Sequence, residues 1–137
     1  MPREMQFLPF EELGGVRFGT AEEIVVVALG RPSERALTAR TKRLALSYED
    51  IVVRFGEDQT AGVQEISASP SSVILEGQLV PGHTLASHIR QIDPASVEQV
   101  GFLISDRLGL MVDLDANEDE PVWITAMSRS DWSAFRT

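Results

Sequence analysis

The chain has 137 residues and a mass of 15.1 kDa, with 43% hydrophobic and 24% charged residues, which suits a single α+β domain over residues 1–137. It contains no cysteine, which excludes disulfides, thiolate metal sites and cysteine nucleophiles. The 21 acidic and 12 basic residues give a net charge of -9, and this field repels a nucleic-acid backbone.

Membrane insertion is also not expected from the sequence. No apolar run approaches the roughly 20 residues that cross a bilayer. The first residues, Met-Pro-Arg-Glu-Met-Gln, do not lead into an apolar stretch of signal-peptide length. We therefore expect a cytoplasmic protein that binds neither nucleic acid nor membrane.

The first predicted element is a helix that begins at Thr20. Thr20 and Glu23 have the spacing of a capping box, in which each side chain accepts from the other residue's backbone amide. The body, residues 24–29, is β-branched, but Gly30 and Pro32 end it as they end helices. Residues 31–43 are polar and arginine-rich without periodicity and are predicted to be a connecting loop, whose order stays open.

Alternating apolar residues and short turn-rich gaps follow this loop. They predict strands at 44–48, 51–55 and 61–66, joined as an antiparallel meander, and a further strand at 73–76. Residues 85–92 place Leu85, Ile89 and Ile92 on one face of a second helix, which Asp93-Pro94 ends.

The last third of the chain is predicted to return to strands. These lie at 100–105, 108–114 and 122–127, the last two as a hairpin across an acidic loop, followed by a short terminal turn at 131–135. The fold class is therefore α+β, a mainly antiparallel sheet of about 5–7 short strands with two helices packed on one face. No internal repeat is visible in the sequence, although each half presents a helix followed by strands.

The hairpin loop concentrates acidic residues, namely Asp113, Asp115, Glu118, Asp119 and Glu120. A calcium loop starting at Asp113 requires glycine where Glu118 stands and a bidentate glutamate where Ile124 stands, so no metal is expected. Two interpretations stay open, a solvated loop and a patch that faces a partner.

Two tryptophans adjoin acidic segments in the same region. Trp123 and Trp132 are candidate interface anchors, although core packing is the alternative for Trp123 because it lies in a strand pattern. The glycines at 14–19 have neither phosphate-loop nor dinucleotide spacing, so we expect no cofactor.

The arrangement resembles the small immunity proteins of bacterial polymorphic toxin systems, including type VI and contact-dependent ones. The resemblance lies in Phe18–Glu23 with Leu29–Pro32, in the region from Tyr48 to Phe55, and in the hairpin at Gly109-Leu110. It implies an acidic α+β protein that neutralises a basic toxin. No individual binding residue is carried over from the family.

The hypothesis from the sequence is thus a non-enzymatic acidic protein that occludes the active or substrate-binding surface of a cognate toxin with a basic surface. The residues that would contact this toxin are Asp113, Asp115, Glu118, Asp119, Glu120, Trp123 and Trp132. A small-molecule-binding regulatory module and an enzyme with a carboxylate site are the alternatives.

Overall fold

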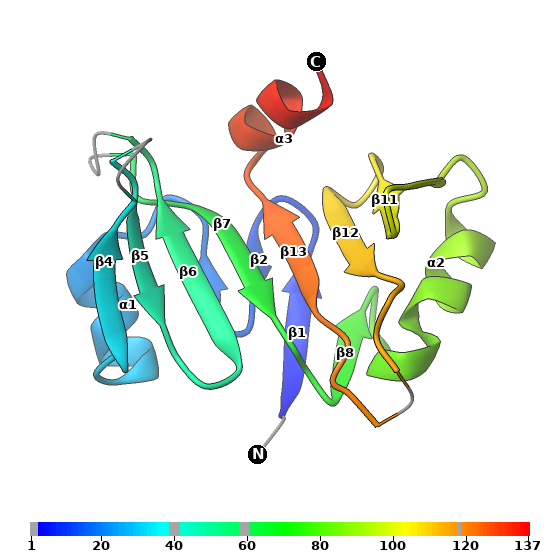
Figure 1. Cartoon of the computed structure of the whole chain (residues 1–137), viewed down its shortest axis with the longest axis horizontal. Coiled ribbons are helices and arrows are strands. Elements are labelled where there is room, and N and C mark those ends of the chain that lie inside the picture. The colour runs from blue at the N-terminus through cyan, green and yellow to red at the C-terminus, as the bar shows by residue number, and fades with distance from the viewer. Residues whose placement is uncertain (1–2, 39–41, 58–60, 118) are drawn as a thin grey trace.

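The computed structural model describes residues 3–38, 42–57, 61–117 and 119–137. Over these residues the chain forms 13 strands in two sheets and three α-helices. Figure 1 shows the larger sheet in front and the smaller sheet behind it. The molecule is therefore a two-layer α+β structure dominated by antiparallel pairing.

The front sheet has eight strands, all joined by antiparallel pairing. In spatial order they are β10 (Val97–Gln99), β11 (Phe102–Ser105), β12 (Leu110–Asp113), β13 (Ile124–Met127), β7 (Val63–Ala68), β6 (Ile51–Phe55), β5 (Leu44–Ser47) and β4 (Glu34–Leu37). β10 and β4 are thus the two open edges of this sheet.

The rear sheet has five strands, in the order β3 (Val16–Arg17), β2 (Glu12–Leu13), β1 (Glu4–Leu8), β8 (Ser72–Leu75) and β9 (Gln78–Pro81). Only the central β1–β8 pair is parallel. The helices are α1 (Glu22–Leu29), α2 (Leu85–Ile92, after a 3-10 turn at Gly82–Thr84) and α3 (Arg129–Arg136). α1 and α2 stand at opposite ends of the molecule (Figure 1).

The two halves of the chain repeat one order of elements. Each half begins with paired strands, β1–β2 or β8–β9, continues with a helix, α1 or α2, and ends with a four-stranded antiparallel meander. The two meanders join through β13 and β7, and the two halves of the rear sheet join through β1 and β8. The order of elements repeats although the sequence shows no repeat.

The main core lies between the two sheets. Alternate residues of each front strand face it, because side chains on a strand point to opposite sides in turn. These buried residues include Leu44, Leu46, Ile51, Val53, Phe55, Ile66, Leu110, Val112 and Ile124. The rear sheet contributes Met5, Phe7, Val73 and Leu75, so both halves of the chain share one core.

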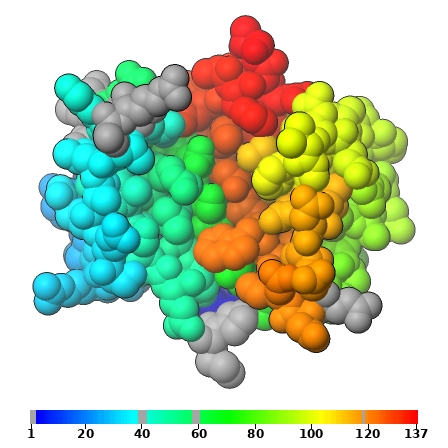
Figure 2. Space-filling view, viewed as in Figure 1, coloured from blue at the N-terminus to red at the C-terminus, as the bar shows by residue number. Residues whose placement is uncertain are grey.

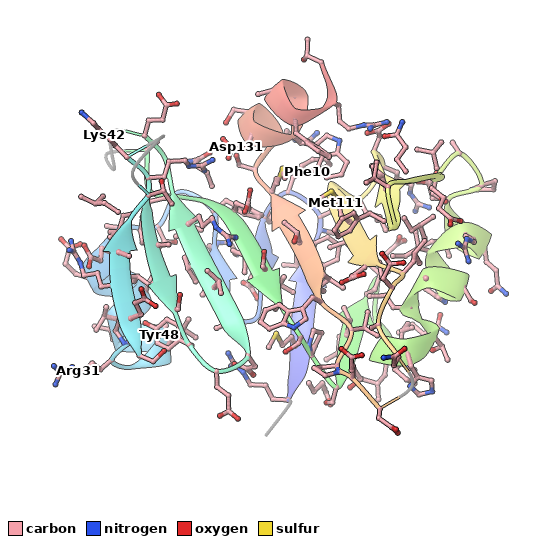
Figure 3. All side chains as sticks on the ribbon, in the orientation of Figure 1. Phe10, Arg31, Lys42, Tyr48, Met111 and Asp131 are labelled. Atoms are coloured by element: carbon pink, nitrogen blue, oxygen red, sulfur yellow. The ribbon has the colours of Figure 1, made fainter. Side chains whose placement is uncertain are left out.

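A second, smaller cluster lies on the outer face of the front sheet. Trp132 of α3 packs there with Ile104 and Met127, and Phe10 and Met111 are partly buried against them (Figure 3). Met111 and Met127 alternate with core residues and so face outward. α3 therefore covers one corner of the outer face.

Most predicted elements are confirmed, but the predicted count of 5–7 strands and two helices is wrong. α2 and the strands β5, β6, β7, β8, β11, β12 and β13 lie where the sequence pattern places them. The terminal turn is longer than predicted and forms α3, whose first turn Ser128 caps by accepting from the Asp131 amide. The short strands β1, β2, β3, β9 and β10 were not predicted.

The predicted helix start at Thr20 is also wrong. α1 begins two residues later, and its N-cap Ala21 has no side-chain hydrogen bond. The Thr20 carbonyl instead accepts from the Val63 amide at 3.0 Å, while the Thr20 amide donates to the Arg17 carbonyl at 3.3 Å. Pairing of this segment with the start of β7 therefore replaces the capping box.

Part of the predicted 31–43 loop is a strand. β4 pairs with β5 in a register that places Glu34 opposite Ser47 and Leu37 opposite Leu44. All four residues of β4 are exposed. Its side chains show no apolar alternation because neither of its faces is covered. Residues 39–41 of the predicted loop lie outside the described residues.

A buried polar pair joins α2 to the front sheet. The Ser105 hydroxyl donates to Asp93 at 2.7 Å and accepts from the Leu108 amide at 3.2 Å, and Ser105 is fully buried. Ser105→Ala leaves both partners unsatisfied, so we expect the free energy of unfolding to fall by about 1–3 kcal/mol. Urea unfolding measures this loss. Ser87→Ala, an exposed change on α2, is the control, and an equal effect of the two variants would show that the pair contributes nothing.

Candidate partner-binding site

The acidic loop joins β12 to β13 at the end of the molecule where α2 lies (Figure 1). Asp113 closes β12 and is partly buried, whereas Asp115, Asp119 and Glu120 are exposed. Glu118 lies outside the described residues. The structure therefore brings the described carboxylates of the predicted patch to one loop.

Local hydrogen bonds fix the form of this loop. The Asp115 amide donates to the Asp113 carboxylate at 2.8 Å, as in an Asx-turn. The Asn117 side-chain amide donates to the Glu120 carboxylate, and the Glu120 amide donates to the Asn117 carbonyl at 3.0 Å. The Leu114 amide donates to the Gly101 carbonyl at 2.8 Å and ties the loop to the β10–β11 turn.

Eight arginines of the described residues form ion pairs with carboxylates outside the loop. Ion pairs join Arg3–Asp50, Arg17–Glu12, Arg35–Glu22, Arg43–Asp131, Arg54–Glu65, Arg90–Glu98, Arg107–Glu76 and Arg136–Asp106. Among the described residues, no lysine or arginine forms an ion pair with Asp113, Asp115, Asp119 or Glu120. Uncompensated negative charge is thus concentrated at this end of the molecule.

A surface cavity of about 320 Å³ lies between this loop and the start of α2. Its apolar lining comes from Ala86, Val112, Leu114 and Val122, and its polar lining from His83, Asp113, Asn117 and Glu120. The described residues contain no group of three or more side chains suited to hold a metal ion. Carboxylates beside an apolar lining suit the stem and charged head of a lysine or arginine side chain.

Trp123 lies beside the acidic loop on the outer face of the front sheet. Its carbonyl accepts from the Asp113 amide at 3.0 Å, so the two residues are directly opposite each other. Phe102, which is 37% exposed, pairs with Asp113 on the other side. Asp113, Trp123 and Phe102 each stand next to a core residue in sequence, so their side chains point to the outer face. An aromatic side chain therefore lies on each side of Asp113. Figure 2 shows this face, with the segment around Asp113 and Trp123 in orange.

Trp132 lies apart from these residues. It is on α3, beyond the opposite end of β13, and is only 6% exposed. Its indole N–H donates to Asp106 at 2.9 Å, and its ring meets Phe135 edge-on at 5.5 Å. Phe102 was not among the predicted site residues, although the apolar run at 102–104 marked its strand.

Comparisons with known proteins do not assign the chain to a class. No family model matches it, and neither the curated proteins nor the solved structures include a significant match. Within the described residues, no helix has the length and apolar character needed to span a membrane. The candidate function therefore rests on the site itself.

Proposed function

We propose that the chain is a cytoplasmic, non-enzymatic binding protein that neutralises a cognate toxin by occluding its active or substrate-binding surface. The observation that carries this proposal is a concentration of carboxylates without an ion-pair partner among the described residues, at Asp113, Asp115, Asp119 and Glu120. They lie beside Phe102, which is exposed, and Trp123, which is partly buried. The resemblance to immunity proteins supports the same class of partner, a toxin domain with a basic surface.

Charge and apolar contact have separate roles in this mechanism. The carboxylates of the loop attract the arginines and lysines that a nuclease uses for phosphate, and this attraction raises the association rate. Trp123 and Phe102 become buried against the toxin and slow its dissociation. The cavity between the loop and α2 receives one cationic side chain of the partner.

The acidic loop is tested by replacing Asp113, Asp115 and Asp119 with asparagine and Glu118 and Glu120 with glutamine. We expect the association rate with the proposed cognate toxin to fall by about 10-fold to 100-fold at low salt, and its salt dependence to weaken. Stopped-flow fluorescence or surface plasmon resonance measures both quantities.

The matched control changes the net charge by the same amount at other places. It replaces five exposed carboxylates with glutamine, namely Glu4, Glu11, Glu23, Glu57 and Glu98. If steering comes from the loop, this control slows association much less than the loop variant does. Equal effects of the two variants would show that net charge alone sets the association rate, and this result would remove the loop from the proposal.

The cavity beside the loop also supports a second candidate, a small-molecule-binding regulatory module. Its volume of about 320 Å³ is at the lower end of ligand pockets. A thermal-shift screen with cationic metabolites distinguishes the two candidates. A metabolite that stabilises the protein, together with no binding to a toxin partner, would favour the module.

A further inference from the structure

On the edge strand β4, the backbone groups of Arg35 and Leu37 that face away from β5 have no partner among the described residues. The Thr38 amide donates to the Arg43 carbonyl at 2.9 Å, which makes this pair a hydrogen-bonded one. Hydrogen-bonded and non-hydrogen-bonded pairs alternate along an antiparallel ladder, so Ala36, two residues from Thr38, is also in a hydrogen-bonded pair with β5. The amide and carbonyl of Ala36 therefore face β5, and those of Arg35 and Leu37 face the open edge. An open edge of this kind is a template for another strand.

Apolar side chains lie beside this edge. α1 has the sequence EEIVVVAL, and among its residues only Val25 is fully buried. Val27 is 85% exposed, and Leu37 of β4 is 56% exposed. A helix that is apolar on most sides is expected to be covered on most sides, so this surface lacks a partner within the described chain.

An ion pair places α1 against β4. The guanidinium of Arg35 donates to both carboxylate oxygens of Glu22, at 2.6 and 3.1 Å, and this pairing holds the pKa of Glu22 below its usual value. Glu22 and Val26 lie on one stripe of the helix, which this pair turns towards β4. The next stripe, Glu23 and Val27, lies about 100° further round the helix, and Val27 is 85% exposed.

We propose that a second copy of this chain binds here, by antiparallel pairing of β4 with β4 about a two-fold axis at Ala36. In this register Ala36 faces Ala36, and Arg35 faces Leu37, so that the outward amides and carbonyls of Arg35 and Leu37 bond to the second copy. The front sheets of the two copies become one continuous sheet. The two α1 helices come together in the layer behind it and cover Val27.

The side chains fit this register. Alanine at the axis suits the close spacing of a non-hydrogen-bonded pair, and Leu37 packs on the aliphatic stem of the opposite Arg35. Glu34 comes opposite Thr38, whose carbonyl accepts from the Lys42 amide at 2.8 Å. Glu34 of one copy therefore comes to the end of the paired strands where Lys42 of the other copy lies, and residues of opposite charge at this end favour self-association.

The placement of charge also favours the β4 end over the α2 end as the interface between two copies. Figure 3 shows Arg31 and Lys42 at the β4 end, whereas the acidic loop lies at the α2 end in Figure 1. Pairing through β4 keeps the two acidic loops far apart and limits repulsion between copies that each carry a charge of -9. The dimer presents two acidic loops at its outer ends, and its existence does not depend on what they bind.

The mass of the full chain in solution tests this proposal. Sedimentation equilibrium is expected to show a concentration-dependent dimer of the 15.1 kDa chain. Val27→Lys combined with Leu37→Lys is expected to raise its dissociation constant about 100-fold, with far-UV circular dichroism unchanged because both positions are exposed. Leu79→Lys with Val97→Lys, at exposed apolar positions outside α1 and β4, leaves dimerisation intact. A monomer at every concentration, or a dimer that only the second variant breaks, would overturn the proposal.

A single cysteine tests the register. The chain has no cysteine, so Ala36→Cys introduces one thiol, which lies at the proposed two-fold axis. Mild oxidation is expected to give a disulfide-linked dimer in high yield, because the side chains of a non-hydrogen-bonded pair approach closely. Cysteine at Leu79 is the control and is expected to cross-link poorly. Equal cross-linking at both positions would reject pairing about Ala36.

Discussion

Replacing Gly62 with alanine is expected to lower the free energy of unfolding by about 3 kcal/mol or more. Gly62 has φ +72°, a conformation that residues with a side chain rarely adopt. An added Cβ would also lie 2.4 Å from the carbonyl carbon and oxygen of Gly19 and 2.8 Å from the Thr20 carbonyl oxygen. These neighbours are backbone atoms, so no side-chain rotation relieves the contact.

The close approach at Gly62 joins α1 to the front sheet. The Gly19 amide donates to the Val63 carbonyl at 2.8 Å, and the Val63 amide donates to the Thr20 carbonyl at 3.0 Å. A Cβ at Gly62 would push these segments apart and weaken both hydrogen bonds. The expected fall in unfolding free energy therefore comes both from weaker attachment of α1 and from backbone strain.

Gly77→Ala separates these two contributions. Gly77 has φ +80°, but a Cβ there meets no atom within 4 Å. This variant is expected to lose only the conformational cost, about 1–2 kcal/mol. Urea unfolding of both variants measures the difference, and equal losses would show that the Gly62 contact is readily relieved.

Trp132→Ala is expected to cost about 3–5 kcal/mol in unfolding free energy, because it removes the centre of the outer cluster. The indole is 6% exposed, packs with Ile104 and Met127, and donates to Asp106. Without it α3 has little apolar contact left with the sheet. The expected result is early loss of α3, followed by unfolding at lower urea concentration.

Trp123→Ala is the matched control. Trp123 is only partly buried beside the acidic loop, so its removal is expected to change stability less and the dissociation rate of the toxin more. Urea unfolding and surface plasmon resonance of the two variants measure these effects. A Trp132→Ala protein of unchanged stability that loses toxin binding would make Trp132 an interface anchor after all.

The sequence predicted the elements whose apolar residues are regularly spaced. Leu85, Ile89 and Ile92 predicted α2, and the alternation over 44–55 predicted β5 and β6, since in each case one face packs on the core. β4 could not be predicted in this way. Its side chains are exposed on both faces, and only its pairing with β5 makes it a strand.

Two short hairpins were also beyond the sequence pattern. Glu76-Gly77 and Val100-Gly101 are two-residue turns with positive φ at both residues. Such turns normally contain Asn-Gly or Asp-Gly, and a β-branched valine with φ 50° is a rare exception. Strand pairing therefore imposes a turn that the local residues do not favour, and β9 and β10 were missed for that reason.

Only the part of the candidate site whose residues are adjacent in sequence could be predicted. The run from Asp113 to Glu120 could be assigned to the β12–β13 hairpin loop because its residues are adjacent in sequence. The cavity beside the loop combines this run with Gly82, His83 and Ala86, and Phe102 reaches Asp113 through strand pairing. Such contacts depend on the topology of the sheets, which spacing along the chain does not reveal.

The central claim is that the acidic loop with Trp123 is the surface that meets the toxin. Amide hydrogen exchange of this chain, alone and bound to the proposed cognate toxin, tests the claim most directly. We predict slower exchange over residues 113–123 and at Phe102 in the complex, with α3 unchanged. Unaltered exchange over 113–123 in a saturated complex, with protection elsewhere, would contradict the account.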